Sequence, residues 1–171
     1  YGFEPKAIVK CRIQGIAAYC DNIKFGWLFF PPNIAREFDP FIIPATKPKN
    51  AYRIFVLGSS AAQGIPDSSY SFSRILEVML SKEYPQVNFE VINAAMTAVN
   101  SYVAVHIVKD CARYKPDLFV IYMGNNEVVG PYGPGTVFTP FSSNLRFIHL
   151  GIDLRGTRIG QLTTNLLQPL I

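Results

Sequence analysis

The chain has 171 residues, of which 49% are apolar and 16% are charged, and its formal net charge is +4. This length suits one domain with a sizeable core, and the scattered lysines and arginines argue against a nucleic-acid-binding protein. The mean hydropathy of +0.18 is high for a soluble domain. We therefore expect more of the same polypeptide, or a partner, to cover part of the surface.

The chain contains neither a signal peptide nor a run of the roughly 18 apolar residues that span a bilayer. It begins at Tyr1, and we interpret it as a piece of a longer product. The cysteines, Cys11, Cys20 and Cys111, form no C-x-x-C pair, which argues against a zinc site and a disulfide framework. Only Cys11 and Cys20 are close enough in sequence to pair, and we interpret them as small buried hydrophobic residues. We expect no metal and no cofactor.

Residues 1–50 are rich in aromatic residues and prolines and show no sustained hydrophobic period. Prolines interrupt helices and inner strands, but the aromatic side chains need burial. The sequence therefore predicts an extended N-terminal arm, residues 1–50, that lies against a domain formed by residues 51–171.

From residue 51 onward, predicted strands and helices alternate. The apolar run 52–57 predicts a first strand, and a helix over 71–83 follows it, with Ser69 or Ser71 as the N-cap. The apolar residues of this helix recur with helical spacing and predict one buried stripe: Phe72, Ile75, Leu76, Met79 and Leu80.

A strand at 89–92, a helix at 101–114 and a strand at 118–123 come next. The last strand is continuously apolar, which is typical of a strand covered on both faces. Right-handed crossovers place the strands in one parallel sheet in the order 2-1-3, so the predicted fold class is α/β, with a three-layer, flavodoxin-like parallel sheet. Three strands leave a long apolar edge, which folded proteins avoid, and we expect the sheet to be incomplete in this chain. After Gly124 the sequence predicts loops until an amphipathic helix at 162–167.

Polar residues follow each predicted strand, at 58–60, 93–98 and 124–127. Because the carboxyl ends of parallel strands meet at one edge of a sheet, where ligands bind, we expect these segments to lie together. A serine nucleophile needs N–H donors, from the backbone or an amide side chain, to stabilise a tetrahedral oxyanion. The three segments supply a hydroxyl, a turn of backbone amides and an asparagine, so they form a candidate site for acyl transfer.

At these residues the sequence resembles the SGNH (GDSL-type) hydrolases. The first block of that family reads roughly G-D-S-x-x-x-G, and residues 58–64 match it with Ser59 in place of the aspartate. The resemblance makes Ser60 the nucleophile, with its own backbone N–H as one oxyanion donor. It makes the backbone N–H of Ala98, at a position where the family has glycine, a second donor.

The family's third block, G-x-N-D, matches residues 124–127. This match makes Asn126 the side-chain oxyanion donor and puts Glu127 in place of the aspartate. More narrowly, residues 125–133 look like large bacterial SGNH proteins that carry tetratricopeptide repeats after the hydrolase domain. The resemblance covers residues 52–138.

The resemblance implies a serine ester hydrolase that acts through a Ser60 acyl-enzyme on a small-molecule or carbohydrate O-acyl ester. It also implies that further sheet strands and repeats of a longer polypeptide are the partners of this chain. A bacterial source follows from the same likeness, as does a membrane-anchored or extracytoplasmic location close to a membrane.

The family's base is a histidine in a D-x-x-H motif, and no aspartate of this chain has a histidine three residues later. His106 falls inside the second predicted helix, where we interpret it as a packing or surface residue. His149 lies in a segment without an equivalent role in the family. We therefore expect the base to lie outside this chain.

A non-catalytic structural or scaffolding module with a vestigial SGNH site is the alternative function. Ser59 in place of aspartate, Ala98 in place of glycine and the absent histidine favour it. Nucleotide binding is disfavoured because residues 58–64 fit neither G-x-G-x-x-G nor G-x-x-x-x-G-K-[ST]. The G-x-S-x-G elbow of α/β-hydrolases fails because Ala62 takes the place of its second glycine.

Overall fold

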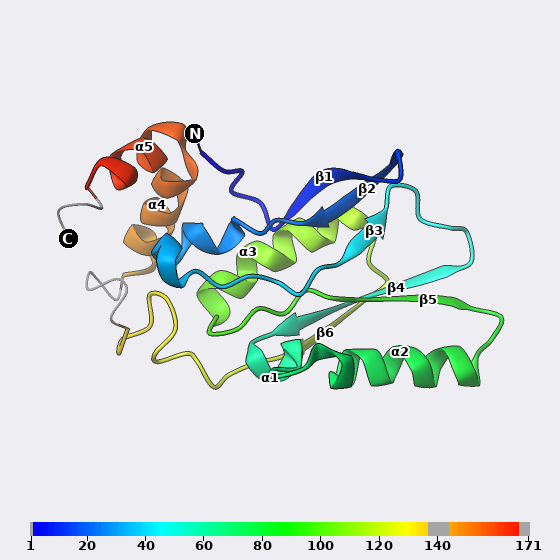
Figure 1. The fold of residues 1–171 in the computed structure, drawn as a ribbon. Helices are drawn as coiled ribbons and strands as arrows, with labels where there is room; N and C mark the ends of the chain where they lie inside the picture. The colour runs from blue at the N-terminus through cyan, green and yellow to red at the C-terminus, as the bar shows by residue number, and fades with distance from the viewer. Residues whose placement is uncertain (1, 137–143, 168–171) are drawn as a thin grey trace.

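The computed structural model describes residues 2–136 and 144–167, and Figure 1 shows their arrangement. The central sheet is parallel, with the strand order β5-β4-β6. Its strands are β4 (Ala51–Gly58), β5 (Asn88–Asn93) and β6 (Leu118–Tyr122). The α/β class and the predicted order 2-1-3 are confirmed, because β4 comes first in the chain and lies between the other two.

The helices lie on both faces of this sheet. Helix α2 (Phe72–Glu83) lies on one face and α3 (Ser101–Cys111) on the other (Figure 1). Ser71 caps α2, since its hydroxyl accepts the Arg74 N–H at 3.3 Å. Helix α3 continues into the 3-10 turn η4 (Ala112–Tyr114), so both predicted crossover helices are confirmed.

The first fifty residues form a second sheet, which the sequence prediction missed. β1 (Ile8–Ile13) and β2 (Ile16–Asp21) pair as an antiparallel hairpin, and β3 (Ile42–Pro44) pairs with β2. Short 3-10 turns, η1 (Phe25–Leu28) and η2 (Pro32–Ile34), connect the hairpin to β3. The prediction of an extended arm was wrong for the hairpin because the prolines concentrate after residue 30, leaving residues 6–30 free of proline.

Cys11 and Cys20 form a disulfide across this hairpin, with their Cα atoms 5.8 Å apart. The interpretation of the two residues as small buried hydrophobic groups was therefore wrong. The spacing between them is long enough for the chain to turn at Gln14 and Gly15 and return on the neighbouring strand. Cys111 is a free, buried thiol, and burial raises its pKa.

The hydrophobic core unites both sheets. Phe55 and Leu57 of β4 lie in the same cluster as Val103 and Ile107 of α3. The N-terminal segment adds four buried aromatic residues to this cluster: Phe25, Phe29, Phe30 and Phe38. The N-terminal segment thus packs against residues that follow it in the chain and supplies a large part of the core.

Two helices follow the last described loop. Helix α5 (Arg158–Leu167) includes the amphipathic helix predicted at 162–167, whereas α4 (Leu145–Gly156) was predicted as loop. Only Ile148 and Ile152 of α4 are buried. The helix therefore lacks the broad buried stripe whose spacing predicts a helix from the sequence. The side chain of Gln161 holds the N-terminal segment in place, accepting the Phe3 N–H and donating to the Phe3 carbonyl, both at 3.0 Å.

Two predicted apolar surfaces are less covered than expected. In the predicted stripe of α2, Ile75 and Met79 are 52% and 63% exposed. Strand β6 is an edge strand, and its residues Leu118, Ile121 and Tyr122 are 43%, 57% and 60% exposed. The expectation that this strand is covered on both faces was wrong, because Ile121 and Tyr122, which point to opposite faces, are both exposed. Within the described ranges, no helix is long and apolar enough to cross a membrane.

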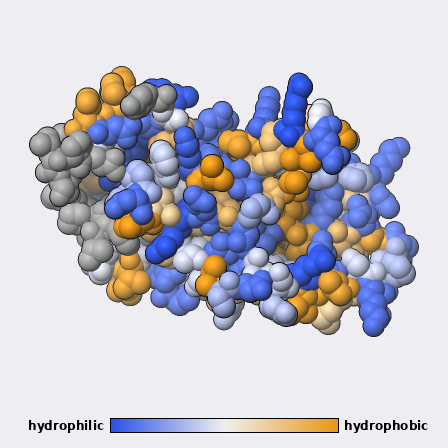
Figure 2. Space-filling model, in the orientation of Figure 1, coloured by the Kyte–Doolittle hydropathy of each residue, from blue (hydrophilic) through white to orange (hydrophobic). Residues whose placement is uncertain are grey.

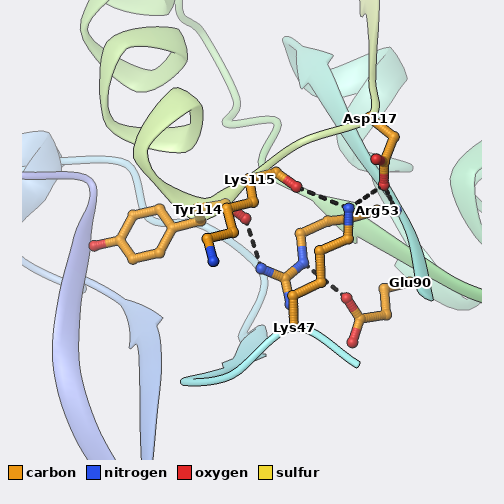
Figure 3. Close-up of polar contacts among 6 residues, drawn as sticks. All are labelled: Lys47, Arg53, Glu90, Tyr114, Lys115 and Asp117. Atoms are coloured by element: carbon orange, nitrogen blue, oxygen red, sulfur yellow. Dashed lines mark hydrogen bonds and ion pairs between the residues drawn. The ribbon is translucent and has the colours of Figure 1, made fainter. Parts of the chain in front are cut away.

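An ionic network around the buried Arg53 joins the amino ends of the three central strands (Figure 3). Arg53 of β4 is 2% exposed; its guanidinium donates to Glu90 of β5 at 2.7 Å and to the Tyr114 carbonyl at 2.6 Å. Asp117, just before β6, accepts the Arg53 backbone N–H at 2.6 Å and also pairs with Lys47. The hydrogen bonds from Lys47 and Arg53 lower the pKa of Asp117.

The close approach of β4 and β6 at Gly58 yields a test of the fold. A Cβ at Gly58 would lie 2.1 Å from the Tyr122 carbonyl oxygen and 2.5 Å from the Ala62 Cβ. We predict that Gly58→Ala lowers the free energy of unfolding by about 1–3 kcal/mol, because β4 and β6 must separate. Urea denaturation measures this change.

Gly151→Ala in α4 is the matched control, because a Cβ there meets no heavy atom within 4 Å. In a helix, alanine is more favourable than glycine by about 0.8–1.0 kcal/mol, so this variant should gain stability. Equal stability of Gly58→Ala and the wild type would contradict the observed packing.

Candidate functional site

Ser60 begins the short helix α1 (Ser60–Gln63), directly after the carboxyl end of β4. The preceding residue, Ser59, is 1% exposed, and its hydroxyl donates to the Asn125 side-chain oxygen at 3.1 Å. Asn125 belongs to the loop after β6, so this bond joins the ends of β4 and β6. Ser60 itself is half-buried, and among the described residues its hydroxyl has no hydrogen-bond partner.

The loop after β5 is tied to α1 from the other side. The Asn93 side-chain amide donates to the Ala62 and Gln63 carbonyls at 3.1 and 3.2 Å. The Thr97 hydroxyl donates to the Gln63 side-chain oxygen at 2.6 Å, and Gln63 is 4% exposed. These bonds hold the loop after β5 beside the turn that carries Ser60.

The loops after β5 and β6 are joined to each other in turn. The Asn126 side-chain amide donates to the Val99 carbonyl at 3.3 Å. Both carboxylate oxygens of Glu127 accept hydrogen bonds from Ser101 at the start of α3, from its backbone N–H at 3.0 Å and its hydroxyl at 2.6 Å. The three loops at the carboxyl ends of the strands are thus connected pairwise by side-chain hydrogen bonds.

The structure brings together the three segments that carry the predicted site residues. Ser60 and Asn126 each follow one partner of the hydrogen bond between Ser59 and Asn125. Ala98 directly precedes Val99, the residue that Asn126 contacts. Ala98 has a φ of 63°, which is the left-handed conformation that glycine adopts without steric cost.

Sequence reasoning missed the contribution of the N-terminal segment to this edge of the sheet. Phe38 forms an antiparallel bridge with Met96, and the Glu37 carbonyl accepts a hydrogen bond from the Gln63 side chain at 3.2 Å. The adjacent Asp39 has a buried carboxylate oxygen without a partner among the described residues. No periodicity marks this segment in the sequence, because it adopts no regular secondary structure.

Neither histidine contacts Ser60 in the described structure. His106 packs its ring 5.6 Å from Phe29 and 6.4 Å from His149, as measured between ring centroids. Burial lowers the pKa of His106, with Lys109 and His149 adding to the effect. His106 packs against Phe29, which is one of the two roles that the sequence left open for it, and His149 lies on the exposed side of α4.

The site offers hydroxyl and amide groups rather than metal ligands. Within the described ranges, no group of three or more His, Cys, Asp or Glu side chains is arranged to hold a metal ion. Comparison of the chain with protein-family models, curated proteins and solved structures finds no match.

The backbone conformation at Ala98 gives a testable difference between neighbouring alanines. We predict that Ala98→Gly keeps or raises the free energy of unfolding, because relief of the left-handed strain, about 1–2 kcal/mol, offsets the added freedom of the unfolded chain. Ala95, which is fully buried and has no positive φ, is the control. Ala95→Gly should cost about 1 kcal/mol, from a lost buried methyl and greater unfolded-state entropy. Thermal or urea unfolding measures both, and equal losses would refute the assigned strain.

Proposed function

We propose that this chain forms part of an SGNH-type serine ester hydrolase in which Ser60 becomes acylated. The observation that carries the proposal is the set of side-chain hydrogen bonds connecting the three loops around Ser60. A site of this kind needs donors that are held in place before the reaction, and these bonds restrain the loops that carry Ala98 and Asn126. The Ser60 hydroxyl, meanwhile, has no partner among the described residues.

The proposed chemistry is acyl transfer in two steps. The Ser60 hydroxyl attacks the ester carbonyl while a base takes its proton, and the alcohol leaves with a proton returned by that base. Water then releases the acid from Ser60 by the same route. The backbone N–H groups of Ser60 and Ala98 and the Asn126 amide would stabilise the oxyanion in both steps. Asn126 can serve in this way because its amide nitrogen carries a second hydrogen besides the one donated to Val99.

We propose that a longer polypeptide supplies the base, and that it also covers the apolar surfaces of β6, α4 and α5. Two features of the described chain support this. The outer edge of β6 is unpaired and apolar, and such edges are normally covered. Helices α4 and α5 also present large exposed apolar side chains: Phe147 (65%), Leu150 (54%), Leu154 (55%), Ile159 (76%), Leu162 (55%) and Leu166 (66%). We propose that further strands pair with β6 and that repeats of the longer polypeptide pack on α4 and α5.

We also propose an extracytoplasmic location for this domain. The disulfide between Cys11 and Cys20 supports it, because disulfides persist in oxidising compartments and are rare in the cytosol. The bacterial source and the carbohydrate O-acyl substrate rest on the sequence resemblance alone.

The second candidate is a scaffolding module with a vestigial site. Its specific support is that Asn126 and Glu127 already make bonds that hold the loop after β6 to Val99 and Ser101. In that case the side-chain hydrogen bonds between the loops serve only to fix them, and Ser60 reacts no faster than a surface serine.

Hydrolysis of p-nitrophenyl acetate distinguishes the two functions. We predict little turnover by the 171-residue chain, since a serine without a base is a weak nucleophile at neutral pH, and recovery in a longer polypeptide that carries a D-x-x-H segment. In that polypeptide Ser60→Ala should abolish turnover, and Asn126→Ala should lower kcat by on the order of 10²–10³-fold, the cost of one oxyanion donor.

Ser68→Ala is the control, because Ser68 lies in a 3-10 turn before α2 and its side chain makes no hydrogen bond in the described structure. Absence of turnover in the longer polypeptide would favour the scaffold. Activity of the 171-residue chain that survives Ser60→Ala would show that another residue is the nucleophile, and loss of that activity in His149→Ala would identify this histidine as the base.

A further inference from the structure

The tip of the β1–β2 hairpin exposes two isoleucines to solvent. Ile13 and Ile16 flank the turn at Gln14 and Gly15, and they are 40% and 72% exposed. A Cβ at Gly15 would meet no heavy atom within 4 Å, so the turn lies clear of the rest of the chain. In Figure 1 this tip lies at the far side of the molecule from α4 and α5.

A hollow of about 500 Å³ lies on the hairpin directly behind this tip. The residues that line it come from both strands and from the start of the next segment: Lys10, Cys11, Arg12, Ala17, Ala18, Tyr19 and Ala45. Lys10 and Arg12 alternate with Cys11 along β1, and therefore share one face of the hairpin with Tyr19, the partner of Lys10 in the register. Two cations and a tyrosine thus surround the hollow, and none of its lining residues is acidic.

Neither cation of the hollow is neutralised within the described chain. Lys10 and Arg12 are exposed and take part in no ion pair or hydrogen bond. Two like charges two positions apart on one strand face repel each other, and an anion between them would relieve that repulsion. Figure 2 shows hydrophilic side chains projecting at this end of the molecule, with hydrophobic ones beside them.

The hairpin is held rigidly enough to act as a preformed surface. The disulfide between Cys11 and Cys20 links its two strands. At its base, the Ala7 N–H donates to the Asp110 carboxylate of α3 at 2.6 Å, and the Tyr19 ring lies 4.7 Å from that of Tyr114. Because the apolar tip and the basic hollow are fixed relative to each other, the hairpin loses little conformational entropy when it binds.

We propose that this hairpin is a contact site for a bilayer that contains anionic phospholipids. Ile13 and Ile16 enter the interfacial region, and the phosphate of a lipid headgroup occupies the hollow between Lys10 and Arg12. The register places Ile13 and Ile16 on the face opposite to Lys10 and Arg12. The hairpin would therefore enter edge-on, with both isoleucines at its tip and the cations just behind them, and cations near an anionic bilayer surface add to the apolar contact. A soluble anion would account for the hollow but leave the isoleucines in water. A second copy that met this one through the same hairpin would bring the same two cations and would repel rather than neutralise them.

Co-sedimentation with phosphatidylcholine vesicles, prepared with and without phosphatidylglycerol, tests the proposal on the 171-residue chain. We expect binding that requires phosphatidylglycerol. Each Lys or Arg near an anionic surface contributes roughly fivefold in partitioning, the equivalent of ~1 kcal/mol, so Lys10→Ala with Arg12→Ala should weaken binding about 30-fold. Ile16→Ser should weaken it on the order of tenfold, through the lost apolar contact.

Two control variants remove the same kinds of side chain, a pair of cations and an isoleucine, from other surfaces. Lys82→Ala with Arg146→Ala leaves the same net charge as the hairpin variant, and Ile159→Ser replaces an isoleucine that is 76% exposed on α5. We expect these controls to bind the vesicles within about twofold of the wild type, because their groups lie outside the contact. Circular dichroism and melting temperature verify that every variant is folded.

Four results would overturn the proposal. Equal losses in the hairpin and control charge variants would mean a nonspecific effect of net charge, and a loss confined to Ile159→Ser would assign the contact to α5. Glycerol phosphate binding, followed by NMR shifts of Lys10 and Arg12, together with no effect of Ile16→Ser on vesicles, would make the hollow a site for a soluble anion. Concentration-dependent self-association that Ile16→Ser abolishes would make the hairpin an interface between copies.

Discussion

The pairing of β4 with β5 on one side and with β6 on the other decides where the polar loops of this chain lie. Because all three strands run in the same direction, their carboxyl ends meet at one edge, and the loops there are close enough to exchange side-chain hydrogen bonds. Gly58 permits the contact, since its missing side chain leaves room for the Tyr122 carbonyl. At the opposite edge, Arg53 of β4 pairs with Glu90 of β5, and its backbone N–H donates to Asp117 just before β6. The candidate site thus depends on strand register first and on individual site residues second.

The sequence predicted those features that local patterns encode. Apolar runs followed by polar turns located the strands and the loops after them, and helical spacing located α2 and α3. The hairpin was missed because its strands carry exposed polar residues such as Lys10 and Arg12 in place of a continuous apolar run. The disulfide was missed because a pair of cysteines has a meaning only once the register of β1 and β2 is known. Helix α4 buries only two residues, so its sequence has no strong helical pattern to set against its glycines, which disfavour a helix.

Within the site, the sequence indicated which residues carry polar groups but not how the loops are held. Gln63 illustrates the difference: it is buried, and it binds Thr97 and the Glu37 carbonyl, yet a glutamine in a short helix gives no signal of this role. The positive φ of Ala98 likewise follows from the path of the loop after β5. The proposed acyl-enzyme therefore combines a motif read from the sequence with a restraint that only the three-dimensional structure shows.

Labelling with a fluorophosphonate, mapped by mass spectrometry, tests the central claim most directly. The reagent forms a covalent phosphonyl ester with an activated serine, so in a longer polypeptide with a D-x-x-H segment the account predicts an adduct on Ser60 that disappears in Ser60→Ala. Ser59→Ala should retain the adduct at a lower yield, because its hydroxyl holds Asn125 rather than reacting. A folded longer polypeptide that remains unlabelled, or one labelled only on another serine, would contradict the claim that these loops form a hydrolase site.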